Sequence, residues 1–252
     1  MSANNYNPCK EDYEFQVFPK SGILFTNMNK NLRNIKDILN KEADENEINL
    51  RTYLLSSIQL NDKKFIQNGC APNWQGNYIT LCTCKHMMRT AEENPENWEN
   101  KWIAGLLYKD ENSAYLVYLM KIKKAFESMF DLWKNLDEDT KISKSARKNK
   151  FGDLFEPKID KIDIKDIESQ VNPCNYYPPC NEHVHIHSWY FDIHSYYNGK
   201  YSVYLLGNNE NSFIYNEKMI VVNHPERKKF TQGAYGKKWT SNKFIENIEL
   251  EK

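Results

Sequence analysis

The sequence lacks an excess of charge of either sign. Its 252 residues include 34 lysines and arginines and 34 aspartates and glutamates, so the formal net charge at pH 7 is zero. A chain that is basic throughout, as many nucleic-acid-binding proteins are, is therefore excluded. Any contact with phosphates must come from a local group of cations.

Long apolar segments are also missing. No apolar run approaches the roughly 20 residues that a membrane-spanning helix needs, and the first residues contain no apolar core typical of a signal peptide. We therefore expect no membrane contact and a cytoplasmic location. In a reducing compartment, the six cysteines would be free thiols or metal ligands and not disulfides.

The pattern of apolar residues predicts one main domain over residues 49–252, with an extension over residues 1–48 that packs on it. Residues 29–43 of this extension have apolar positions at helical spacing. Residues 137–165 are rich in charge and have little periodicity, which predicts an insertion on the surface. Its lysines and arginine could meet phosphates, although such runs are more often solvated faces.

Short apolar runs dominate the main domain. Residues 102–108 and 114–122 are of strand length and are separated by a short polar turn, which predicts a hairpin. Further strands are expected over residues 50–60, 201–206 and 212–215, and a helix capped by Thr240 should follow. Many short strands with few helices predict an α+β fold with a mostly antiparallel, barrel-like sheet and a few flanking helices.

Chemically useful residues concentrate in residues 69–89. Pro72, Asn73 and Gly76 predict a loop, and Thr83 could cap a helix that starts near Cys84 and ends near Glu93. Lysine and arginine at positions 85 and 89 would share one face of that helix, and a helix N-terminus attracts anions. The alternative is an ordinary strand-to-helix connection with a solvated basic face.

The same stretch resembles the signature of the nucleotide modification associated domain 2 family, which occurs in phage and bacterial gene neighbourhoods linked to altered DNA bases. The residues that carry the resemblance are Ala71-Pro72-Asn73, Gly76, Tyr78, Thr80-Leu81, Thr83-Cys84-Lys85, Arg89, Trp102–Gly105, Leu116–Ile122, Phe130–Trp133, Gly152-Asp153, Ser202–Leu206 and Phe213–Tyr215. It covers about residues 50–250. The order of elements around the hairpin is also similar to barrels of the PUA and EVE type, which hold modified bases.

The resemblance implies a protein that recognises a nucleobase or nucleotide in a DNA-modification or phage-conflict system, with nucleic acid or a free nucleotide as partner. Lys85 and Arg89 would neutralise phosphate, Trp74 or Tyr78 would stack on a base, and Asn73 would read a base edge. The predicted nucleotide-binding residues are Asn73, Trp74, Tyr78, Thr80, Lys85 and Arg89.

Two alternatives remain open at this point. The first is an enzyme that modifies a base or nucleotide with Cys84 or Cys82 as nucleophile, because a thiol at a helix N-terminus beside a lysine should have a lowered pKa. The second is an interaction protein stabilised by zinc. Its ligands would be His183, His185 and His187, which alternate as in a strand and would project from one face of a sheet. The alternative, which the lack of any known zinc-module spacing favours, is a plain polar face.

Overall fold

The computed structural model describes residues 16–17, 27–41, 49–76, 78–226, 228–231, 233 and 236–252. In this part of the chain the main sheet contains eight strands, and its hydrogen-bonded order is β12-β2-β6-β7-β10-β5, with β11 and β13 attached through β7. The strands are β2 (Leu50–Leu54), β5 (Thr80–Leu81), β6 (Trp102–Tyr108), β7 (Ser113–Phe126), β10 (Tyr204–Ile214), β11 (Ile220–Asn223), β12 (Lys237–Trp239) and β13 (Ile248–Leu250).

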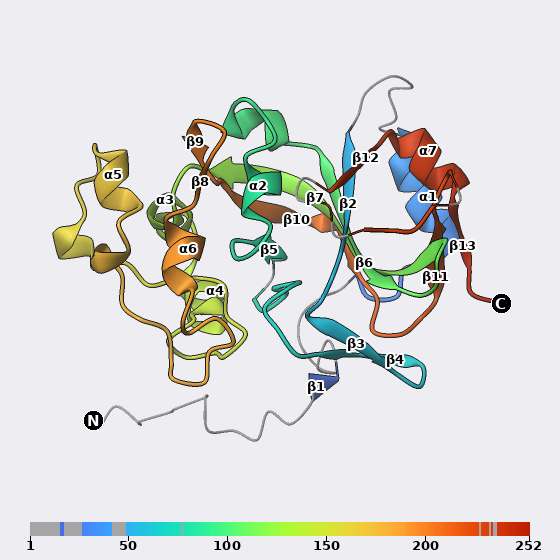
Figure 1. Ribbon diagram of the computed structural model, residues 1–252, viewed down its shortest axis with the longest axis horizontal. Coiled ribbons are helices and arrows are strands. Elements are labelled where there is room, and N and C mark those ends of the chain that lie inside the picture. Colours follow the sequence, from blue (N-terminus) through green and yellow to red (C-terminus); the bar gives the residue numbers. More distant parts are fainter. Residues whose placement is uncertain are drawn as a thin grey trace.

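The long strand β7 is the axis of this sheet, because β6, β10 and β11 all pair with it in antiparallel register. The β2–β6 pair is parallel, and the other pairs of the sheet are antiparallel. The β7–β10 and β6–β7 ladders both contain register shifts, which bend the strands. The sheet curls into a half-barrel (Figure 1), so the predicted α+β fold with a mostly antiparallel, curled sheet is confirmed.

Two smaller sheets flank the main one. In the first, β4 (Lys64–Gln67) pairs with both β3 (Ile58–Asn61) and β1 (Gln16–Val17), which ties part of the N-terminal extension to the main domain. The second is the hairpin of β8 (Tyr196–Tyr197) and β9 (Lys200–Tyr201). The predicted hairpin over residues 102–122 corresponds to β6 and β7 and is confirmed.

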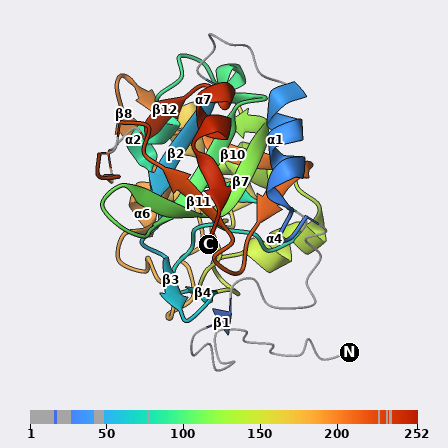
Figure 2. The ribbon, with the colours of Figure 1, turned by 90° about the vertical axis from the view of Figure 1, so that its right-hand side faces the viewer.

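Helices gather at both ends of the main sheet (Figure 1). The helices are α1 (Leu32–Lys41), α2 (His86–Arg89), α3 (Met129–Lys134), α4 (Glu138–Lys144), α5 (Ile167–Gln170), α6 (Trp189–Ile193) and α7 (Ser241–Glu246), with 3₁₀ turns at Pro95–Trp98, Ile159–Lys161 and Pro173–Asn175. Figure 2 shows α1 and α7 side by side at one end, where α1 buries Ile35 and Leu39 in the main core. Thr240 accepts a hydrogen bond from the backbone N–H of Lys243 and caps α7, as predicted.

The opposite end carries a second apolar core, to which α3 and α6 contribute residues. It includes Phe130, Leu154, Phe155, Tyr176 and Ile193, all nearly or fully buried. Part of the charged segment 137–165 thus lies inside the protein, which differs from the expected exposed insertion. Among the described residues, no helix combines the length and the hydrophobicity needed to cross a bilayer.

Candidate functional site

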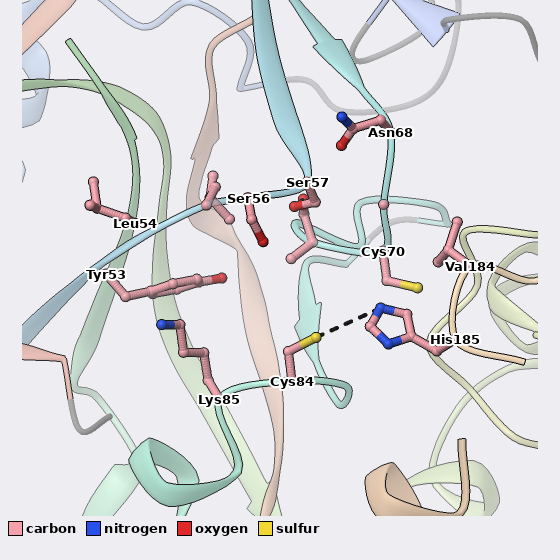
Figure 3. Close-up of a pocket in the computed structure, with 13 residues that line it drawn as sticks. Tyr53, Leu54, Ser56, Ser57, Asn68, Cys70, Cys84, Lys85, Val184 and His185 are labelled. Atoms are coloured by element: carbon pink, nitrogen blue, oxygen red, sulfur yellow. Dashed lines mark hydrogen bonds between the residues drawn. The ribbon is translucent and has the colours of Figure 1, made fainter. Parts of the chain in front are cut away.

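A cavity of about 440 Å³ lies where three separate parts of the chain meet. The end of β2 and the residues after it form one wall, and the loop at residues 68–71 forms the second (Figure 3). The third wall consists of the turn before α2 and the segment around residue 185. Polar groups that line the cavity include those of Tyr53, Asn68, Cys84, Lys85 and His185. This volume falls in the range of small-molecule sites, about 300–1,000 Å³.

Cys84 and His185 face each other across one side of the cavity. The Cys84 Sγ atom lies 3.8 Å from Nε2 of His185, although the two residues are 101 positions apart in sequence. Figure 3 shows both side chains at the cavity surface. A thiol within hydrogen-bond reach of an imidazole nitrogen can lose its proton to that nitrogen, and this is the arrangement of a nucleophile with its base.

The backbone at this thiol is unusual. Cys84 and Lys85 have φ values of 58° and 47°, so two consecutive residues that are not glycine lie in the left-handed region. Each such residue costs about 1–3 kcal/mol unless its surroundings hold it, and conformations of this kind cluster at functional sites. The left-handed turn also shortens the following helix. The prediction of a helix from Cys84 to Glu93 capped by Thr83 is wrong, because α2 begins only at His86 and no side chain caps it.

Two buried side chains hold the turn in place. Asp192, from α6, accepts hydrogen bonds through Oδ1 from the backbone N–H of Cys84 at 2.9 Å and from Nε2 of His86 at 2.8 Å. Arg89 donates from Nε to the carbonyl oxygen of Cys84 at 3.0 Å and from Nη1 to that of Val203 at 2.6 Å. The left-handed turn is therefore clamped on both sides of Cys84, and the same helix α6 lies next to the segment that delivers His185.

Burial controls the protonation of Cys84. Burial, and secondly the negative charge of Asp192, raise the pKa of the thiol to about 11, against the weaker opposing effects of Arg89 and Lys85. The predicted lowering of this pKa is wrong, because the loss of hydration outweighs the neighbouring cations. At neutral pH the resting residue is a thiol, and its proton must leave during any attack.

Lys85 brings the cationic group into the cavity. Its Nζ atom lies 5.2 Å from the centre of the Tyr53 ring, a cation–π distance. Burial lowers the pKa of the amine, while its interaction with Cys84 works in the other direction. An anionic or electron-rich ligand in the cavity would meet this ammonium group directly.

The other predicted nucleotide-binding residues lie elsewhere. None of these five residues lines the cavity. Four of them are buried, namely Asn73, Trp74, Thr80 and Arg89. The fifth, Tyr78, is half-buried, and the amine of Lys123 lies over its ring. The Trp74 indole packs in the main core and donates a hydrogen bond to Gln67. Cys82, the other candidate nucleophile, is fully buried in the second core.

The three histidines do not form a strand. Residues 183–187 form successive turns, in which the N–H of Ile186 bonds to the carbonyl of His183, so the prediction of three imidazoles on one strand face is wrong. His183 is buried, His185 lines the cavity and His187 is exposed. In the described ranges, no group of three histidine, cysteine, aspartate or glutamate residues is arranged to hold a metal ion.

The cysteines in the described part of the chain divide into two classes. Four of them have free thiols: Cys70, Cys82, Cys84 and the exposed Cys174. Cys70 also lines the cavity. Cys180 is disulfide-bonded. The expectation of six reduced cysteines is thus wrong at Cys180.

A buried polar network lies in the core and was missed by sequence reasoning. Lys144, at the end of α4, is fully buried and donates to Asn73 and Thr80, and Thr80 in turn donates to Asp153. The available signal was the spacing of four between Thr140 and Lys144, which places both on one helix face. Because most lysines in charged segments are solvated, the sequence predicts an exposed Lys144 instead of a buried one. Asp192 and Tyr53 were missed as well, since neither stands in a recognisable motif.

Comparisons with known proteins add no relative: no family model, no curated protein and no solved structure matches this chain.

Proposed function

We propose that this protein is a thiol-dependent enzyme that acts on a nucleobase or nucleotide bound in the cavity. The observation that carries the proposal is the 3.8 Å distance between Cys84 Sγ and His185 Nε2 at the cavity wall. Cys84 acts as nucleophile and His185 accepts its proton. The left-handed turn, clamped by Asp192 and Arg89, supports this role, because it fixes the sulfur at the surface of the cavity.

The raised thiol pKa defines the order of events. A thiol with a pKa of about 11 is protonated at neutral pH, so the S–H proton passes to Nε2 of His185 as the sulfur bonds to an electrophilic carbon of the substrate. In an attack on a polarised C=C or C=N bond of a base, the displaced electron pair moves onto the ring. The Lys85 ammonium lies in the same cavity and stabilises that negative charge.

Three features support a nucleobase or nucleotide as the substrate. The cavity has the volume of a small-molecule site and offers a cation, the amide of Asn68 and a thiol. The stretch that contains Cys84 and Lys85 resembles a family associated with altered DNA bases. The half-barrel sheet supports the similarity to PUA and EVE barrels that the order of elements suggests, and on these grounds we propose a role in a DNA-modification or phage-conflict system.

Recognition of a base without turnover is the second candidate. The raised pKa of Cys84 favours it, because a protonated thiol can serve as part of a binding surface without reacting. In this case Lys85 and Asn68 contact the ligand, and the Cys84–His185 pair contributes only shape and a weak hydrogen bond.

The test is mass spectrometry of nucleotides and oligonucleotides incubated with the protein, which reads binding and turnover together. We expect turnover by the wild type and by Cys174→Ser, an exposed-thiol control, and its loss in Cys84→Ser and His185→Gln. Full turnover by Cys84→Ser would refute the nucleophile. Retention of a nucleotide without any product, weakened by Lys85→Met and unaffected by Cys84→Ser, would establish the second candidate instead.

A further inference from the structure

Lys144 occupies an environment that is rare for lysine. Its side chain is fully buried, and its Nζ atom lies within hydrogen-bond distance of three oxygen atoms: the backbone oxygen of Asn73 at 2.8 Å, Oδ1 of Asn73 at 2.6 Å and Oγ1 of Thr80 at 3.1 Å. Asn73 and Thr80 are nearly completely buried too. An amine and a carboxamide are thus held together in a place without bulk water.

The orientation of the Asn73 amide is fixed. Its Nδ2 group donates to the carbonyl oxygen of Phe151 at 2.7 Å, so Oδ1 must point toward Lys144. A C=O bond is about 1.2 Å long, so a nitrogen at hydrogen-bond distance from Oδ1 lies about 3–4 Å from the amide carbon Cγ. Distances near the lower end of this range correspond to a geometry that precedes bond formation.

A proton acceptor is connected to the amine. Thr80 Oγ1, which accepts from Lys144, donates to Oδ2 of Asp153 at 2.7 Å, and Asp153 is also buried. Burial lowers the pKa of Lys144 to about 8 and raises that of Asp153 above its usual range. Both shifts favour the uncharged pair, in which the amine has a free lone pair and the carboxyl group holds a proton.

We propose that Lys144 and Asn73 form an intramolecular isopeptide bond, with Thr80 and Asp153 carrying the protons. The neutral Lys144 amine attacks Cγ of Asn73, and the resulting tetrahedral carbon expels Nδ2. The departing nitrogen takes one proton from the Asp153 carboxyl group and leaves as ammonia. The carboxylate regains a proton from the new amide nitrogen through Thr80 Oγ1. One C–N bond forms and one breaks, and no oxidant, metal or cofactor takes part.

The crosslink would join two parts of the chain that are 71 positions apart. It ties the end of α4 to the loop that precedes β5, and it therefore fastens the second core to the main sheet. The proposal is independent of the chemistry at Cys84, since none of its four residues lines the cavity.

Mass spectrometry of the intact, reduced and denatured protein decides the question. We expect a mass about 17 Da below that of the sequence, the loss of one ammonia. Tryptic digestion should then give residues 65–85 joined to residues 142–147, because trypsin does not cleave after an acylated lysine. The full sequence mass, with separate peptides, would overturn the proposal.

Ammonia can also be lost when an asparagine followed by glycine cyclises, as at Asn68 and Asn198. A mass loss without the joined peptide would therefore overturn the proposal as well. In the variants, Lys144→Met and Asp153→Ala should show the full sequence mass, and Lys141→Met, one turn earlier on the same helix, should retain the loss. Persistence of the loss in Lys144→Met would refute the proposed bond. Should that variant fail to fold, the wild-type digest alone remains decisive.

Discussion

Buried His183 should make the folded protein sensitive to mild acid. The side chain is only 2% exposed, and its ring meets the edge of Phe155. Burial, together with the neighbouring His185, lowers the pKa of His183 from 6.5 to about 4. The folded protein therefore keeps this imidazole neutral at a pH where the unfolded chain protonates it.

The size of the effect follows from the difference between these pKa values. The folded-state pKa is the lower one, so the stability contribution is fully present above about pH 6.5 and is lost as the pH falls toward 4. At pH 5 the free energy of unfolding should be about 2 kcal/mol lower than at pH 7.5, and at pH 4 about 3 kcal/mol lower, from this residue alone.

The assay is urea denaturation at a series of pH values, for the wild type and for His183→Gln, which cannot titrate in this range. Other groups contribute equally to both proteins, so the difference between the two curves isolates His183. We expect the wild type to lose about 2 kcal/mol more than His183→Gln between pH 7.5 and 5. The exposed His187, as His187→Gln, is the matched control and should follow the wild type. Parallel curves for the wild type and His183→Gln would show that the imidazole is hydrated or paired in the folded protein.

Two further perturbations probe the sheet and the cavity. In Gly105→Ala, the new Cβ atom would lie 2.0 Å from Cε1 of Tyr118, so the ring must move and its 2.7 Å hydrogen bond with Tyr53 must break. We expect the free energy of unfolding, measured by urea denaturation, to fall by about 2–4 kcal/mol. An unchanged denaturation midpoint would contradict this packing. For Cys84, with a pKa raised to about 11, the alkylation rate measured by peptide mass spectrometry should keep rising up to about pH 11. A plateau below pH 8 would show that burial does not control this thiol.

The strands of the sheet were readable from the sequence because their signals are local. Residues 102–108 are apolar on both faces and form β6 with the predicted bounds. The middle of this strand must be a glycine, Gly105, because the Tyr118 ring of the neighbouring strand occupies the place of a Cβ atom. The local sequence pattern does not reveal this contact. Residues 204–214 form one strand with a shifted register, where the sequence predicts two separate strands over residues 201–206 and 212–215.

The candidate site was only partly readable, because its geometry depends on long-range contacts. The sequence predicts a role for Cys84, and the residue lines the cavity, but its left-handed backbone depends on Asp192, 108 positions away. Alternation of histidines with valine and isoleucine predicted a strand over 183–187, yet no strand pairs with this segment in the described part of the chain. A β pattern without a partner has no ladder to stabilise it.

The sequence separation of Cys84 and His185 has a consequence for biosynthesis. A ribosome adds about 5–20 residues per second, so about 5–20 seconds pass between the synthesis of the thiol and that of its imidazole partner, 101 positions later. Val203, whose carbonyl holds the Arg89 clamp, is made later still. Under the proposed function, a nascent chain would therefore lack the reacting pair until most of its length has been synthesised, and a prematurely terminated product would carry the cysteine without the imidazole that contacts it.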